Sequence, residues 1–196
     1  MYNKVVVPLD GSKLAEVVLP HLEEIAKGCS IPEIILVSVT EDIKGKTSKA
    51  YAIEGASARE FHMAPQGGPL PLGSTYSGMI YSVDTRTTEA PADFGKMAKT
   101  AWDYLLKIAV QLREKGLNSS ISVLVGNNPA EEIVRFAKEQ AADLIVMGSR
   151  GKSGFNRWDM GNVADKVIRA TDITVVLAKP KPGFKETKAK RKGKPN

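Results

Sequence analysis

The sequence contains a single cysteine, Cys29, among its 196 residues. One cysteine excludes an internal disulfide and a metal site built from cysteines. No apolar run approaches the roughly 20 residues that a membrane-spanning helix requires. The first residues lead directly into the apolar residues 5–7, without the charged and apolar regions of a signal peptide. We therefore expect a cytoplasmic protein.

Signals of enzymatic catalysis are also scarce. No serine, histidine and aspartate stand in a catalytic order, and no residue is an evident base for activating water. The two histidines, His21 and His62, have no partner at metal-ligand spacing. Lys152 and Ser153 follow Gly151 as in a Walker-type phosphate loop, but the earlier glycine of that loop is missing. We expect no catalytic residues, no metal ligands, and at most weak ATP hydrolysis.

Positive charge is concentrated at one end of the chain. The net charge is +6, but residues 179–196 carry eight Lys and Arg side chains and one Glu, which leaves residues 1–178 with a charge of −1. Proline and glycine interrupt this tail, so we expect it to be disordered. A solubilising end and weak attraction to nucleic acid or anionic lipid are both compatible with its composition. No aromatic platform accompanies the charge, which favours the first alternative.

The apolar pattern of residues 1–178 predicts one α/β domain. Five short apolar runs are predicted strands, at residues 4–9, 33–39, 120–125, 144–147 and 174–178. Segments with apolar residues at helical spacing separate them and predict helices near residues 14–28, 94–116, 129–137 and 162–170. This alternation is typical of a doubly wound parallel sheet with helices on both faces.

Three of the predicted helices have features that the structure can test. Pro20 lies inside the first helix and predicts a bend there. Asn128 precedes Pro129 at the start of the third, where we expect the Asn128 side chain to cap the helix and Glu131 to complete a capping box. The second helix presents one apolar stripe that we expect to be buried, formed by Phe94, Met97, Ala98, Ala101, Tyr104, Leu105, Ile108 and Leu112.

Residues 41–92 interrupt the alternation. They are rich in glycine and proline and show no sustained period. A structureless connection of this length is unusual inside a compact domain, and a lid, a partner surface and plain disorder are alternative explanations. Apolar residues at positions 76, 80, 81 and 83 would allow part of the segment to become ordered. We expect an insertion that is disordered or only partly ordered.

Two loops at the carboxyl ends of predicted strands carry unusual chemistry. Ligands of open α/β sheets bind at this edge, where the strand order reverses. The loop after the first strand reads PLDGS, and the loop after the fourth reads MGSRGKSG. The glycines of the second loop permit positive φ and close approach to a ligand, and Arg150 and Lys152 add positive charge. The helix that follows Gly161 offers free N–H groups to an anion. Together these segments predict a phosphate site.

Three stretches make a family resemblance specific. Gly148, Gly151 and Gly161 stand at the spacing Gly-x2-Gly-x9-Gly, which resembles the ATP-binding signature of the universal stress protein family. The stretch DLIVMGSRGKSGFNRWDMGNVADKVIRATDITVVLAKP is similar to that family almost throughout, as are VVVPLDGS and VGNNPAEEIV. The resemblance covers residues 1–41 and about 93–180. It implies a five-stranded parallel sheet of order 3-2-1-4-5, in which the first and fourth strands are neighbours.

The resemblance also implies a ligand, ATP or another adenine nucleotide, with Mg²⁺ or Mn²⁺ bound through its phosphates. Asp10 matches the position that accepts hydrogen bonds from ribose hydroxyls, and Val39 matches the position that lines the adenine slot. Asn162 departs from the family pattern, which has Ser or Thr at the phosphate-contacting position. The expected binding residues, to which Arg150 is added for its charge, are Pro8, Leu9, Asp10, Val39, Met147, Gly148, Arg150, Gly151, Gly161, Asn162 and Val163.

Family members act in stress responses, and the resemblance implies that the bound nucleotide serves as a signal rather than as a metabolic substrate. It also implies a homodimer through the fifth strand, residues 174–178, whose apolar edge would benefit from cover. Two other functions stay open at this point. One is a protein-interaction module of the same family that binds no nucleotide, and the other is a slow ATPase.

Overall fold

The structure is a computed structural model that describes residues 1–40, 79–83, 96–151 and 160–181. The predicted disorder of the basic tail beyond residue 181 and of most of the insertion lies outside these residues. The same holds for Lys152 and the rest of the glycine-rich loop up to residue 159.

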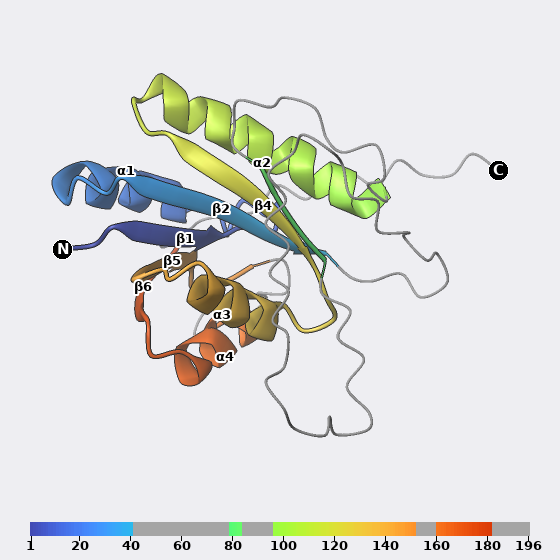
Figure 1. Cartoon of the computed structure of the whole chain (residues 1–196). Coiled ribbons are helices and arrows are strands. Elements are labelled where there is room, and N and C mark those ends of the chain that lie inside the picture. Colours follow the sequence, from blue (N-terminus) through green and yellow to red (C-terminus); the bar gives the residue numbers. More distant parts are fainter. Residues whose placement is uncertain (41–78, 84–95, 152–159, 182–196) are drawn as a thin grey trace, which may run out of the picture.

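The centre of the described chain is a sheet of six strands (Figure 1). In chain order these are β1 (Lys4–Pro8), β2 (Glu33–Thr40), β3 (Met79–Val83), β4 (Ser119–Val125), β5 (Leu144–Gly148) and β6 (Thr174–Ala178). Their order across the sheet is β3-β4-β2-β1-β5-β6. The five strands β4, β2, β1, β5 and β6 are parallel and follow the predicted order 3-2-1-4-5, which confirms the expected doubly wound topology.

The sixth strand comes from within the insertion. β3 pairs antiparallel with β4 at one edge of the sheet, with Tyr81 opposite Val123. Residues 41–92 therefore include an ordered piece, at the place where the sequence offered a short apolar run. The strand order still reverses between β1 and β5, because β3 extends the far edge only.

Helices cover the two faces of the sheet in pairs. α1 (Val18–Gly28) and α2 (Lys96–Glu114) pack on one face, and α3 (Pro129–Glu139) and α4 (Asn162–Ala170) pack on the other (Figure 1). Successive side chains of a strand point to opposite faces. In β1, Val5 and Val7 accordingly join the cluster under α1 and α2, whereas Val6 joins the cluster under α3 and α4.

The first helix begins later than the sequence predicted. Residues 13–17 form successive turns, and α1 begins at Val18. Pro20 has no N–H to donate to the carbonyl of Glu16, which accepts a 3.0 Å hydrogen bond from Leu19 instead. Pro20 thus lies in the first turn of α1, where proline is tolerated, and not at a bend inside a longer helix.

The start of α3 differs from the predicted capping box. Pro129 opens the helix and Glu131 lies in its first turn, as expected, but the Asn128 side chain makes no capping hydrogen bond. The N-terminus of α3 is therefore stabilised by proline geometry and by acidic residues near the helix dipole.

Candidate functional site

Two loops meet where the strand order reverses. β1 and β5 are neighbours, with Val6 opposite Ile145, so the loops that follow them leave the sheet side by side. The chain travels from β1 through β2 to β4 on one side and returns to β5 on the other. This is the switch point at which open α/β sheets bind their ligands.

Asp10 joins the two loops. Its Oδ1 accepts a 2.9 Å hydrogen bond from the N–H of Ser12, which fixes the turn after β1. Its Oδ2 lies against the backbone of the other loop, since a Cβ added to Gly151 would come within 2.3 Å of it. The Asp10 carboxylate therefore fixes the turn after β1 and also reaches the glycine-rich loop.

Gly161 closes the glycine-rich loop on itself. Its N–H donates a 2.8 Å hydrogen bond to the carbonyl of Ser149. A Cβ on Gly161 would lie 3.2 Å from that carbonyl oxygen and 3.3 Å from Cα of Arg150. The chain therefore returns to Arg150 immediately before α4 begins, and the helix N-terminus is brought next to Gly151.

The glycines act here by close approach and not by positive φ. Among the described glycines, positive φ occurs at Gly11 and Gly116, away from the three signature positions. Gly161 has φ −64° and ψ 144°, which other residues also adopt. Gly148 packs on the turn before α1, since its Cβ would lie 3.1 Å from the carbonyl oxygen of Leu14. Of the two properties that the sequence offered for these glycines, the structure uses the close approach at Gly148 and Gly151 and not the positive φ.

The apolar members of the predicted site lie below this edge. Met147 is buried, and Val39 and Val163 pack against the cluster under α3 and α4. Leu9 is buried and donates its N–H to the carbonyl of Val37 at 2.8 Å, while Pro8 ends β1 and is also buried. These apolar residues therefore lie next to the loops that follow β1 and β5.

Asn162 and Arg150 flank the loop in different ways. Asn162 is the first residue of α4, and its side chain is exposed. Arg150 is half-buried beside Gly161. Both positions are at the N-terminal end of α4, where free N–H groups and the helix dipole favour an anion.

Three neighbours of Asp10 were not predicted from the sequence. Ser12 is buried, and its Oγ accepts a 3.1 Å hydrogen bond from the N–H of Ala15. Glu16 lies in the same turn, and the carboxylates of Glu16 and Asp10 both act electrostatically on the phenol of Tyr104 on α2. Burial, followed by the negative charges of Glu16 and Asp10, raises the pKa of the Tyr104 phenol. A tyrosine on an apolar helical stripe gives no signal in the sequence that two carboxylates act on its hydroxyl.

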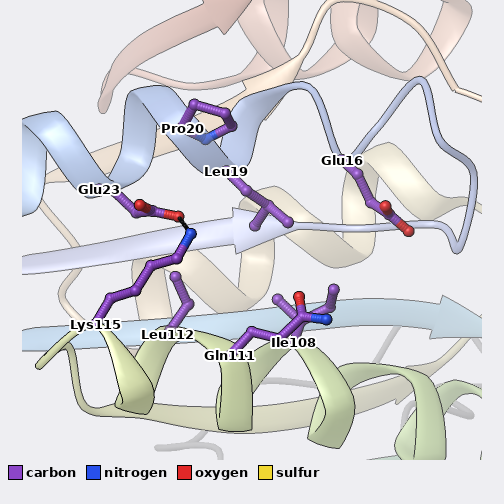
Figure 2. Close-up of a pocket in the computed structure, with 8 residues that line it drawn as sticks. All are labelled: Glu16, Leu19, Pro20, Glu23, Ile108, Gln111, Leu112 and Lys115. Carbon is purple, nitrogen blue, oxygen red and sulfur yellow. Dashed lines mark hydrogen bonds and ion pairs between the residues drawn. The ribbon is translucent and has the colours of Figure 1, made fainter.

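Two grooves among the described residues have no lining residue from the glycine-rich loop and do not include Asp10. One, of about 210 Å³, runs between α1 and α2, with Leu19, Pro20, Ile108 and Leu112 along it (Figure 2). An ion pair between Lys115 and Glu23 crosses it at 2.5 Å.

Within the ranges that the structure describes, no group of three His, Cys, Asp or Glu side chains is placed to hold a metal ion. No described helix is both long enough and apolar enough to cross a membrane.

The fold and the paired loops define a doubly wound α/β protein with a glycine-rich loop at its switch point. The model of the universal stress protein family matches residues 78–179. A curated relative, universal stress protein MJ0531 of Methanocaldococcus jannaschii, is 30% identical over 92% of this chain and 85% of its own length. The chain therefore belongs to the universal stress protein family.

Solved structures agree with this fold. Universal stress protein MJ0577 of the same organism is 28% identical to the chain over 92% of it and 97% of the relative. The MJ0577 structure superposes with a TM-score of 0.61 and 24% identity, covering 93% of this chain and 99% of that one. A universal stress protein in complex with cAMP superposes with a TM-score of 0.52 and 18% identity, covering 90% and 95%.

Proposed function

We propose that the chain binds an adenine nucleotide, ATP in the first place, between the loops after β1 and β5, and acts as a nucleotide-dependent signalling module in a stress response. The observation that carries this proposal is the contact of the Asp10 carboxylate with Gly151. It unites an acceptor for ribose hydroxyls with a backbone surface for phosphates at one switch point.

Each part of the nucleotide has matching residues in this proposal. Asp10 accepts hydrogen bonds from the ribose, and Val39 and Met147 offer apolar surface to the base. The phosphates lie on the backbone of Gly148 to Gly151 and at the N-terminus of α4, near Gly161 and Val163. Arg150 adds positive charge, and the exposed Asn162 amide donates a hydrogen bond in place of the usual hydroxyl.

A divalent cation, Mg²⁺ or Mn²⁺, fits this arrangement only through the phosphates. Asp10 is the one carboxylate of the two loops within the described ranges, and it already takes part in the turn at Ser12. No described group of three acidic or histidine ligands lies near it. When bound, such an ion neutralises phosphate charge, while the backbone N–H groups and Arg150 hold the phosphate oxygens on the protein side.

The comparisons support an adenine ligand at the level of the family. A solved universal stress protein of the same fold holds cAMP, which shares the adenine and ribose of ATP. The family signature at Gly148, Gly151 and Gly161 is complete in this chain, apart from the asparagine that follows it.

Calorimetric titration of the full chain with ATP, with and without Mg²⁺, tests the proposal. We expect binding in the native chain and at least a tenfold loss in Asp10→Ala, because the ribose loses its acceptor. Asp103→Ala is the matched control, since Asp103 is an exposed carboxylate on α2 that pairs with Lys99. Its affinity should equal that of the native chain.

The Asn162→Ser variant separates this proposal from its main rival. Binding by native chain and variant alike supports the nucleotide module. If neither chain binds ATP, ADP, AMP or cAMP, the proposal fails and the result favours a protein-interaction module of the same family. Binding that appears only in Asn162→Ser means that this asparagine has abolished the site. Phosphate release in the same samples would identify a slow ATPase.

We also propose that two copies of the chain associate through β6. This strand stands at the edge of the described sheet, and its middle residues Val175, Val176 and Leu177 are only half-buried. Ile168 on the neighbouring α4 is 39% exposed. Pairing along β6 would satisfy the free backbone groups of the edge and cover these side chains. Sedimentation of the native chain should show a dimer, and Val176→Lys should shift it to a monomer.

A further inference from the structure

The chain leaves the last strand of the sheet beside the glycine-rich loop. Gly148 and Ala178 are partners in the ladder between β5 and β6. Just beyond β5, the N–H of Ser149 donates a 2.8 Å hydrogen bond to the carbonyl of Ala178. Because Lys179 follows Ala178 directly, the residues after β6 begin at the loop that we propose to hold the phosphates.

The N-terminus of α4 reaches Ser149 from its other side. The carbonyl of Ser149 accepts a 2.8 Å hydrogen bond from the N–H of Gly161, the residue that precedes α4. Two hydrogen bonds through Ser149 therefore connect the end of β6 with the end of α4 that favours an anion. A phosphate group bound at this end of α4 would lie close to the residues that follow β6.

Two lysines stand at this place. Lys179 and Lys181 are the first charged residues after Ala178, and both are exposed. Neither takes part in an ion pair between described residues, although Glu24 lines the same groove as Lys179. They are also the first two of the eight Lys and Arg side chains that, with one Glu, give residues 179–196 a charge of +7.

The two ammonium groups can act on a phosphate by charge even without direct contact. At a salt concentration of about 0.1 M, charges interact over about 10 Å before screening removes most of the attraction. The glycine-rich loop at Ser149 is one backbone hydrogen bond from the residue that precedes Lys179, and so lies within that range. Interactions between exposed charges are individually weak, so the combined effect should be a few-fold change in affinity.

We propose that Lys179 and Lys181 form a positively charged margin of the phosphate site and make the chain prefer a nucleoside triphosphate to forms with fewer phosphates. This inference rests on the proposed nucleotide site and names the residues that set its preference for ligand charge. If these lysines served solubility alone, neutralising them would leave nucleotide affinity unchanged.

The test compares ATP, AMP and adenosine, which share the base and the ribose but differ in phosphate charge. In the full chain carrying Lys179→Gln and Lys181→Gln together, we expect the ATP affinity at about 0.1 M salt to fall about fivefold. The adenosine affinity should stay within about twofold of the native value, and AMP should show an intermediate loss. At about 1 M salt, where screening acts within about 3 Å, the loss for ATP should shrink to about twofold or less.

Two further double variants separate the position of the charge from the net charge. Lys27→Gln with Lys107→Gln removes the same charge from exposed positions, in the last turn of α1 and on α2, which packs on β2 and β4. This control should bind ATP as tightly as the native chain does. Lys179→Arg with Lys181→Arg keeps the charge at the margin and should also retain the native affinity.

The outcomes separate this inference from the proposed function. Equal loss for ATP and adenosine, no loss for ATP, or an equal loss in the Lys27 and Lys107 control overturns the role of the margin while the nucleotide site stands. A native chain that binds none of the three ligands overturns the proposed function and this inference with it. Urea unfolding of each variant shows that it is folded, so that an affinity change reports on the site.

Discussion

Oδ2 of Asp10 and the backbone of Gly151 are in contact across the switch point of the sheet. A single carbon atom added at Gly151 would lie 2.3 Å from that oxygen, closer than nonbonded atoms can approach. The two residues are 141 positions apart in the chain and come together because β1 and β5 are neighbours. Only glycine, which has no Cβ, leaves room at position 151 for the Asp10 carboxylate.

Gly151→Ala should therefore weaken nucleotide binding by at least about tenfold. The new methyl group displaces the flexible end of the Asp10 side chain, which leaves the turn at Ser12 or loses its place beside the ribose. The free energy of unfolding should change by less than about 1 kcal/mol, because a side-chain end and not a backbone atom yields. Calorimetry with ATP and urea unfolding measure the two quantities.

Gly28→Ala provides the control for this substitution. No atom lies within 4 Å of a Cβ at Gly28, which ends α1 at an exposed position. Its nucleotide affinity should match that of the native chain. If Gly151→Ala binds ATP as tightly as the native chain does, Asp10 and Gly151 are not part of one ligand site.

The positions of the parallel strands could be predicted from the sequence, whereas the buried face of α2 could be predicted only in part. Five apolar runs between turn residues marked the parallel strands to within one or two residues. Most of the predicted stripe on α2 is confirmed, because Ala98, Leu105, Ile108 and Leu112 are buried and Ala101 and Tyr104 are partly buried. Met97 is instead 45% exposed, Trp102 is fully buried although the sequence did not single it out, and Phe94 lies outside the described residues. Apolar residues cover more than half of the circumference of this helix, so their spacing leaves the centre of the buried face undecided.

The sequence allowed us to predict which two loops form the candidate site, but not which of their side chains are in contact. Glycines, an aspartate and strand ends are local signals, and the topology implied by the family resemblance placed them together. Whether Asp10 would face Gly151 depends on side-chain packing between segments far apart in sequence. β3 is similar, because a five-residue segment with four apolar residues, inside a long glycine-rich stretch, becomes a strand only when the edge of β4 is available.

Gly161→Ala should reduce stability more than Gly151→Ala does. A Cβ at Gly161 would press on backbone atoms, 3.2 Å from the carbonyl oxygen of Ser149 and 3.3 Å from Cα of Arg150. Backbone atoms cannot rotate away as a side-chain end can. Relieving this contact therefore lengthens the 2.8 Å hydrogen bond from the N–H of Gly161 to the carbonyl of Ser149, which closes the loop. We expect a loss of about 1–3 kcal/mol in the free energy of unfolding. A urea midpoint equal to that of the native chain would contradict this account of the loop.

A carboxylate at the amino ends of β1 and β5 leads to a prediction about pH. The Asp143 carboxylate accepts the N–H of Asn3 at 2.8 Å and the N–H of Lys4 at 3.1 Å, and so ties the start of the chain to β5. Partial desolvation pushes the pKa of Asp143 upward, but these backbone donors outweigh it and the net pKa is lowered.

Because the pKa of Asp143 is lower in the folded chain, its contribution to stability is complete above the unfolded value of about 4 and disappears as the pH falls through the folded value. Asp143→Asn should therefore lower the free energy of unfolding by about 1 kcal/mol at pH 7 and by progressively less below pH 4 or so. Urea unfolding of native chain and variant at both pH values measures this difference. A difference that is the same at low pH would mean that charge at Asp143 does not contribute and that shape alone anchors the first strand.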